Sequence, residues 1–150
     1  GEVLNKGSFL AFTVAKNLRT SGSGRLFDQS NVNGGAVISS NGNDQLFGVT
    51  SIGNLNILNS IVSLTQALRT SQILSGNSKI RQNGANEINN ASVFTMSGNT
   101  GIPFVIGDNS PATGSIAFQG TMQEILIYTT NNNLNILPIE SQINNYYSIY

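Results

Sequence analysis

The sequence predicts an all-β fold, an antiparallel sandwich of two sheets with a short helix at its C-terminal end. Short segments rich in β-branched and aromatic residues recur between clusters of Gly, Asn and Ser, which is typical of many short strands joined by turns. Apolar residues take up helical spacing in the tail, after Pro138. The 150 residues fit one domain, and a domain of this size can bury a substantial core.

The first predicted strand, residues 9–15, carries apolar side chains on both of its faces. Alternation places Leu10, Phe12 and Val14 on one face and Phe9, Ala11, Thr13 and Ala15 on the other. We therefore expect a central strand that is covered on both sides. A turn at residues 20–24 leads into a second strand around residues 25–29.

A hairpin is the clearest turn prediction. Strands at residues 35–40 and 45–51 flank Asn41-Gly42-Asn43-Asp44. The Asn-Gly pair supplies the positive backbone φ angles that a tight hairpin turn requires.

The middle of the chain alternates less clearly. Residues 57–66 predict a strand, with a short helix as the alternative because the alternation is blurred. Residues 78–82 predict a short strand that ends in the turn dipeptide Asn83-Gly84. Residues 85–101 are mostly polar and predict a loop, with a further strand at residues 93–96.

Two strands and a helix complete the predicted order. Residues 103–107 and 118–128 read as strands on either side of a polar loop. Pro138 suits the first turn of a helix because it lacks an N–H donor and has a fixed φ. The apolar positions at helical spacing are Ile139, Ile143, Tyr146, Tyr147 and Tyr150. This spacing predicts a C-terminal helix, and it favours packing over sugar stacking as the role of the three tyrosines.

Charge and composition exclude several functions. Charged residues make up 9% of the chain, and 7 basic side chains balance 7 acidic ones, so neutral polar residues must keep the surface hydrated. Such a surface suits an extracellular, cell-surface or virion protein. The basic residues are scattered, which excludes nucleic acid as a partner, and no apolar run is long enough for membrane insertion. Cysteine is absent, so disulfides and thiolate metal sites are impossible.

One strand carries a longer pattern. It runs Phe118-Gln119-Gly120-Thr121-Met122-Gln123-Glu124-Ile125-Leu126-Ile127-Tyr128. Alternation puts Thr121, Gln123, Ile125 and Ile127 on one face and Phe118, Gly120, Met122, Glu124, Leu126 and Tyr128 on the other. A carboxylate therefore lies among apolar neighbours.

This strand resembles the closing strand of the laminin-G-like, concanavalin A-like lectin/glucanase superfamily. The family pattern is Phe-x-Gly-x-Ile-x-Glu-Ile-x-Ile-Tyr, followed by a loop, a Leu and a terminal helix with an acidic residue and a Tyr. Leu134 and then residues 138–150 with Glu140 match that order. Segments 8–14, 79–84 and 104–107 resemble other strands of the family.

The resemblance implies a jelly-roll sandwich with structural roles for Gly120, Glu124 and Tyr128. We expect the Glu124 carboxylate to accept backbone N–H bonds from an adjacent loop. The family has a further strand upstream that pairs beside the C-terminal one, whereas this sequence starts at Gly1. We therefore expect a larger polypeptide or assembly, in which a further chain segment or a neighbouring subunit covers an open sheet edge beside residues 118–128.

Catalysis is not expected. Some members of the superfamily hydrolyse glycosides with paired carboxylates from one strand, but no two carboxylates here lie within five residues of each other. Glu87 and Glu124 form the least unfavourable distant pair. His and Cys are both absent, which removes the usual general base and the thiol nucleophile.

Calcium is the cofactor that the resemblance favours, because lectin-like sandwiches often hold it in loops with oxygen ligands. The candidate ligands are Asp108, Asn109, Asn43 and Asp44. Turn formation is the alternative role for these four residues.

Two functions remain open from the sequence. The first is a non-catalytic glycan-binding or receptor-binding adhesion module of a microbial surface or phage virion protein, with a glycan or a protein receptor as partner. The second is a purely structural domain that decorates or links such an assembly. A glycoside hydrolase is a less favoured third reading.

Overall fold

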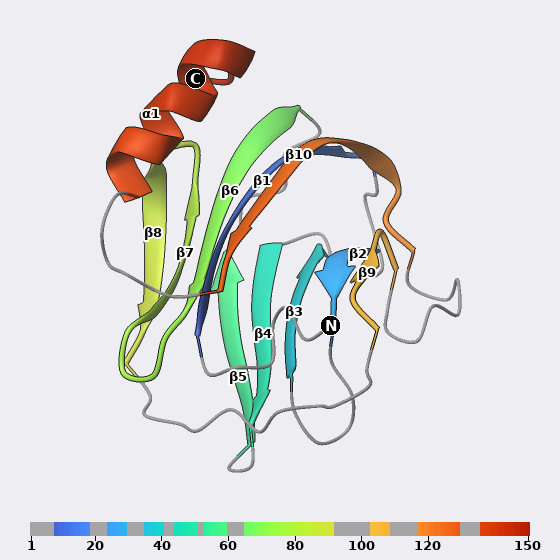
Figure 1. The fold of residues 1–150 in the computed structure, drawn as a ribbon, viewed down its shortest axis with the longest axis vertical. Helices are drawn as coiled ribbons and strands as arrows, with labels where there is room; N and C mark the ends of the chain where they lie inside the picture. The colour runs from blue at the N-terminus through green and yellow to red at the C-terminus, as the bar shows by residue number, and fades with distance from the viewer. Residues whose placement is uncertain are drawn as a thin grey trace.

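The structure is a computed structural model, and it describes residues 8–18, 24–29, 35–40, 44–50, 53–59, 65–91, 103–108, 117–129 and 136–150. Within these ranges, two antiparallel five-stranded sheets pack face to face, and helix α1 (Ile136–Tyr147) lies over the outer face of one of them (Figure 1). This arrangement confirms the predicted all-β sandwich with a short C-terminal helix.

We call the sheet beneath α1 the helix-covered sheet. Its strands, in spatial order, are β10 (Gly120–Tyr128), β1 (Phe9–Asn17), β6 (Gln66–Ile73), β7 (Ser78–Gln82) and β8 (Ala85–Asn90). The strands of the second sheet, in spatial order, are β5 (Gly53–Asn59), β4 (Asp44–Thr50), β3 (Gly35–Ser40), β2 (Gly24–Asp28) and β9 (Val105–Ile106). The first and last strands of the described chain, β1 and β10, are therefore neighbours.

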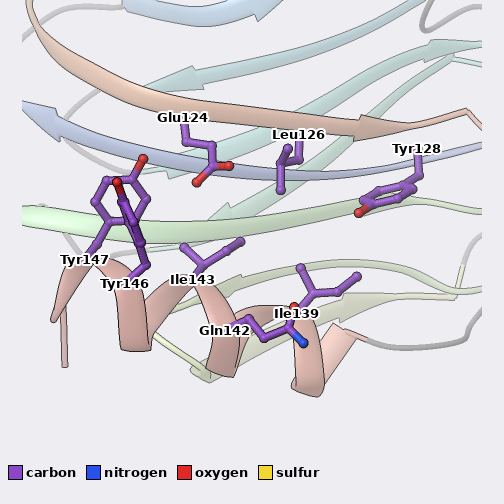
Figure 2. Close-up of a pocket in the computed structure, with 8 residues that line it drawn as sticks. All are labelled: Glu124, Leu126, Tyr128, Ile139, Gln142, Ile143, Tyr146 and Tyr147. Carbon is purple, nitrogen blue, oxygen red and sulfur yellow. The ribbon is translucent and has the colours of Figure 1, made fainter.

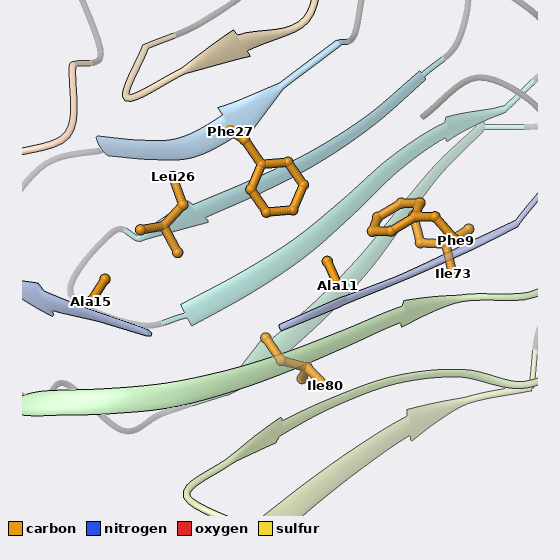
Figure 3. Close-up of a cluster of buried hydrophobic side chains, with 7 residues drawn as sticks. All are labelled: Phe9, Ala11, Ala15, Leu26, Phe27, Ile73 and Ile80. Atoms are coloured by element: carbon orange, nitrogen blue, oxygen red, sulfur yellow. The ribbon is translucent and has the colours of Figure 1, made fainter. Parts of the chain in front are cut away.

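Strand β1 is buried on both faces, as its sequence predicted. Its first set of alternate residues, with Phe9 and Ala11, joins the core between the two sheets, where Leu26 and Phe27 of β2 meet it (Figure 3). The other set packs beneath α1 around Ile143. Members of this second cluster are Leu10, Phe12, Val14, Leu68 and Ile143. One strand thus supplies two cores because a sheet lies on one side of it and a helix on the other.

The predicted assignment of alternate β10 residues to the two faces of the sheet is right for most of the strand and wrong at its start. Glu124 pairs with Val14, but the next pair is Met122 with Ala15, so Gln123 is an extra residue in β10. Such a bulge shifts alternation by one position. Met122 consequently packs against the inter-sheet core with Ile125 and Ile127, and not on the face of Glu124.

The hairpin of β3 and β4 pairs as predicted, with Ser40 opposite Asp44. Its turn residues 41–43 lie outside the described residues. The turn between β7 and β8 is also confirmed, since Asn83 and Gly84 have φ angles of 52° and 69°. These positive values are the reason for the Asn-Gly dipeptide.

Two predictions in the middle of the chain are wrong. The single element expected at residues 57–66 covers the end of β5 and the first residue of β6, two strands that belong to different sheets, and its residues 60–64 lie outside the described residues. The expected loop at residues 85–101 begins with strand β8. Polar residues dominate both β6 and β8, which hides their alternation. The strand expected at residues 93–96 lies outside the described residues.

Helix α1 begins at Ile136, and Pro138 stands in its first turn, as expected. The Asn144 side chain closes the other end, because its Oδ1 accepts the backbone N–H groups of Ile149 and Tyr150 at 2.9 Å each. Its Nδ2 donates to the carbonyl oxygen of Tyr150 at 2.7 Å. The last residues are thereby folded back onto the helix end. In the described part of the chain, no helix has the length and apolar character to span a membrane.

Candidate functional site: a groove between β10 and α1

A groove of about 420 Å³ lies between β10 and α1, on the outer face of the helix-covered sheet. Figure 2 shows its two walls, one from the strand and one from the helix. The lining residues are Glu124, Leu126, Tyr128, Ile139, Gln142, Ile143, Tyr146 and Tyr147. This volume falls at the small end of the range for ligand pockets in proteins.

The periodicity of each element builds one wall. On β10, alternate residues from Glu124 to Tyr128 share the face toward α1, and four residues of strand span about 13 Å. On α1, the lining residues follow positions i, i+3, i+4, i+7 and i+8 from Ile139, which lie on one helical stripe. Ile143, only 6% exposed, forms the floor.

Aromatic rings stand at both ends of the groove. Tyr146 and Tyr147 lie near Glu124, and Tyr128 lies at the far end (Figure 2). The Tyr146 and Tyr147 rings meet edge to face with centroids 4.8 Å apart, yet Tyr146 remains 81% exposed. Tyr128 packs against Phe12 at 6.2 Å and is 43% exposed. Both ends therefore offer aromatic surface to a ligand.

The sequence expectation that all three C-terminal tyrosines serve packing is wrong for Tyr146. Tyr147 does pack on the cluster beneath α1. Tyr150 places its hydroxyl close to Gly84 in the β7–β8 turn. Tyr146 instead extends from the helix beyond the cluster, because position i+7 from Ile139 falls at the rim of the buried stripe.

Two polar side chains complete the lining. The Glu124 carboxylate lies near the Tyr147 hydroxyl at one end of the groove (Figure 2). Its expected hydrogen bonds from a loop backbone stay a prediction. Partial burial, together with the nearby Glu124 carboxylate, raises the pKa of the Tyr147 hydroxyl above its usual value. Gln142 extends from the opposite wall (Figure 2).

A buried ion pair holds the helix wall in place. Arg81 of β7 donates hydrogen bonds from Nε and Nη2 to the two carboxylate oxygens of Glu140 on α1, a residue that is 2% exposed. The Thr70 hydroxyl of β6 donates to the same carboxylate at 2.6 Å. Burial acts to lower the pKa of Arg81, but hydrogen bonds to Glu140 and Glu87 raise it on balance. These bonds attach α1 to β6 and β7, in addition to its packing on the apolar cluster around Ile143.

The predicted structural residues Gly120, Glu124 and Tyr128 all lie on β10. Gly120 stands where β10 meets the end of β1, and a Cβ atom there would overlap the carbonyl oxygen of Lys16. Only glycine permits that approach. Glu124 and Tyr128 line the groove, so the structure brings two of the three into one site.

The two calcium candidates that the structure describes, Asp44 and Asp108, lie apart from each other. Asp44 begins β4 and Asp108 follows β9, two strands that are separated by β3 and β2 in the second sheet. Three strand spacings amount to about 14 Å, too far for one ion. Asn43 and Asn109 lie outside the described residues. Among the described residues, no group of three or more His, Cys, Asp or Glu gathers around a point. Calcium stays a prediction, and equal melting temperatures with calcium and with EDTA would end it.

The hydrolase pair is not supported by the geometry. Glu87 lies on β8 and Glu124 on β10, the two opposite edges of the helix-covered sheet. Four strand spacings separate them by about 19 Å, whereas glycoside hydrolysis needs carboxylates about 5 to 10 Å apart. Glu87 instead accepts a hydrogen bond from Arg81 at 2.6 Å.

Solved structures share this fold at low sequence identity. The carbohydrate-binding module CBM40 of the Ruminococcus gnavus IT-sialidase aligns with a TM-score of 0.70 and 12% identity over 92% of this chain and 83% of its own. The same module bound to α2,6-sialyllactose gives a TM-score of 0.65, also at 12% identity, over 92% of this chain and 84% of its own. The binding domain of botulinum neurotoxin serotype D gives 0.63 and 8% identity over 92% of this chain and 37% of its own.

These likenesses show a shared β-sandwich fold. No protein-family model and no curated protein matches the sequence. At 8 to 12% identity the shared feature is the fold. Of the laminin-G-like assignment, the comparisons support the broader part, a β-sandwich fold of the kind found in carbohydrate-binding modules and toxin binding domains.

Proposed function

We propose that this chain is a non-catalytic glycan-binding module that uses the groove between β10 and α1 as its site. The observation that carries the proposal is the exposed ring of Tyr146 above a groove whose polar groups are Glu124 and Gln142. Aromatic faces pack against the C–H faces of sugar rings, while carboxylate and amide groups pair with hydroxyls. The fold shared with a carbohydrate-binding module supports the same proposal.

A binding role suits the groove better than catalysis. Glu124 is the one carboxylate among the described lining residues, and hydrolysis of a glycoside by the usual route needs two. The ligand is a free glycan or the glycan of a surface receptor. With its low charge, the chain suits an extracellular setting on a microbial surface or a virion, and that setting is part of the proposal.

Glycan-array binding followed by calorimetry tests the site. We expect Tyr146→Ala to weaken binding about tenfold, since a stacked aromatic ring is lost. Asn145→Ala is the matched control, because Asn145 is an exposed neighbour on α1 that does not line the groove. If no glycan binds, or if both variants weaken binding equally, the groove is not the site.

A structural role in an assembly is the second candidate function, and the edge position of β10 favours it. In the described part of the chain β10 pairs with β1 on one side, and no described strand pairs with its other side. A nine-residue edge strand presents unpaired backbone donors and acceptors, which a further chain segment or a neighbouring subunit can pair with.

Hydrogen exchange distinguishes this candidate. In the isolated chain, the outward amides of β10 should exchange faster than those bonded to β1. In an assembly that contains the chain and covers this edge, the exchange of the outward amides should slow by about a hundredfold or more. Unchanged exchange in the assembly would contradict the structural role and leave glycan binding unaffected.

A further inference from the structure

We infer that the groove selects uncharged sugars and discriminates against acidic ones. This inference rests on the proposed glycan-binding function and adds the class of ligand. It depends on the positions of the charged groups around the groove.

The groove itself carries negative charge. Of its eight lining residues, Glu124 alone has a charged side chain, and the others are apolar, tyrosine or amide. Its carboxylate lies toward the interior of the groove beside Tyr147 (Figure 2). An acidic sugar bound on the same surface would place a second carboxylate near the first, and at such spacing like charges repel even with partial solvent screening.

Arg81, the cation that bonds to Glu140 of α1, is already paired. Arg81 donates to Glu140 at 3.0 and 3.2 Å and to Glu87 at 2.6 Å, and its Nη2 also reaches the carbonyl oxygen of Gly84 at 2.7 Å. Recognition of a ligand carboxylate favours a guanidinium or ammonium with free donors. Arg81 lies on β7, two strands beyond β1, and does not line the groove.

Lys79 of β7 also lies on this side of the sheet, where it pairs with Glu87 at 3.4 Å. Lys16 is a further cation on this side. It stands on β1 two positions after Val14, the partner of Glu124, and pairs with Thr121. Its side chain is exposed and does not line the groove. An acidic group that extends beyond the Glu124 end could still approach Lys16, so the experiment includes a variant at this position.

Uncharged sugars match the groups that are present. Sugar hydroxyls donate as well as accept, and the Glu124 carboxylate offers two acceptor oxygens to them. Gln142 supplies both a donor and an acceptor from the opposite wall. The apolar ring face then rests on tyrosine. Each group thus has a complementary partner on a neutral sugar, whereas an added carboxylate has none.

Matched probes test the inference in the whole chain. A glycan array that contains neutral glycans and their acidic counterparts, such as lactose and sialyllactose, is measured with the unaltered protein, Glu124→Gln, Lys16→Gln and Tyr146→Ala. For the best neutral ligand we expect the acidic counterpart to bind about fivefold more weakly or worse. Glu124→Gln should reduce that difference, and Lys16→Gln should not. High salt should reduce it in the unaltered protein.

The outcomes separate the two proposals. Neutral preference that narrows in Glu124→Gln supports the inference. Preference for acidic glycans, or a neutral preference unchanged in Glu124→Gln, overturns it while glycan binding stands. If the unaltered protein and Glu124→Gln bind no glycan at all, the proposed function fails and the inference fails with it. A thermal melt of each variant confirms that every sample is folded.

Discussion

The guanidinium of Arg81 holds the carboxylate of Glu140 through two hydrogen bonds, Nε to Oε1 at 3.0 Å and Nη2 to Oε2 at 3.2 Å. These residues lie 59 positions apart in sequence. They join α1 to β7, which lies three strands from β10 in the helix-covered sheet, and α1 packs in addition on the apolar cluster around Ile143.

Neutralising this pair should lower stability. Glu140→Gln removes a carboxylate that is 2% exposed and leaves Arg81 without its main partner, so we expect the free energy of unfolding in urea to fall by about 2 to 3 kcal/mol. The double variant Arg81→Met with Glu140→Leu leaves no buried charge unpaired and should recover much of that loss. A double variant less stable than Glu140→Gln would contradict this account.

Gly120→Ala should weaken the junction of the first and last strands. Its new Cβ would overlap the carbonyl oxygen of Lys16, so the two backbones must separate. We expect a loss of about 3 kcal/mol or more, measured by denaturant unfolding. Thr121→Ala, at the exposed neighbouring position, is the control and should change stability by about 0.5 kcal/mol or less. Equal effects of the two substitutions would remove the case for a structural glycine.

Asn144→Ala should loosen the C-terminal tail. Its side chain makes three hydrogen bonds to the backbone of Ile149 and Tyr150, at 2.7 to 2.9 Å. Their loss should cost about 1 to 2 kcal/mol and speed amide exchange at residues 149–150. Asn145→Ala is the control on the exposed side of α1. Retained protection of residues 149–150 in Asn144→Ala would show that the cap is unimportant.

Alkaline pH should destabilise the helix end. Partial burial, with a nearby carboxylate, raises the pKa of both Tyr147 and Tyr150 above the ordinary 10.0. A raised pKa means that the folded state favours the protonated hydroxyl. The resulting stability is complete below pH 10 and is lost as pH rises through the folded-state values.

Unfolding in urea at several pH values from about 9 to 11, with tyrosinate absorbance as a second readout, measures this loss. Tyr147→Phe with Tyr150→Phe removes both hydroxyls and should flatten the pH dependence. The same alkaline loss in the double variant would assign it to other groups.

Local patterns predicted the elements that depend on local chemistry. Strand β1 was predictable because both of its faces are apolar and each meets a core. The turn at Asn83-Gly84 was predictable because its positive φ angles select those residue types. Helix α1 was predictable from Pro138 and the spacing that follows it.

Strand β6 could not be predicted because several of its polar residues are buried and form hydrogen bonds with residues outside the strand. Arg69 is 1% exposed and donates to the carbonyl oxygen of Ala15 at 3.1 Å. Thr70 donates to Glu140, and Gln72 donates to the carbonyl oxygen of Asn77 at 2.8 Å. Buried polar groups with such partners are acceptable in a fold, yet they break the hydrophobic alternation that marks a strand.

The sequence singled out only some of the residues that line the groove. Glu124 and Tyr128 stood out through the family resemblance, and Tyr146 through its helical spacing, whereas Gln142 did not, although it shares the helical stripe of Ile139. A helical wheel shows which residues share a face, but not that β10 lies opposite. The bulge at Gln123, which sets the face of Met122, also depends on pairing with β1.

The pairing of β1 with β10 has a consequence for how the chain folds. Leu10 pairs with Tyr128, so the edge of β1 that bonds to β10 can form its hydrogen bonds only after nearly the whole described chain has been synthesised. Closing a loop of that length is slow, and contacts between distant residues dominate the rate. Until β10 is available, β1, one of the most apolar strands, has an unpaired edge that can bind another chain. Efficient folding should therefore depend on β10 being synthesised before β1 meets other unfolded chains.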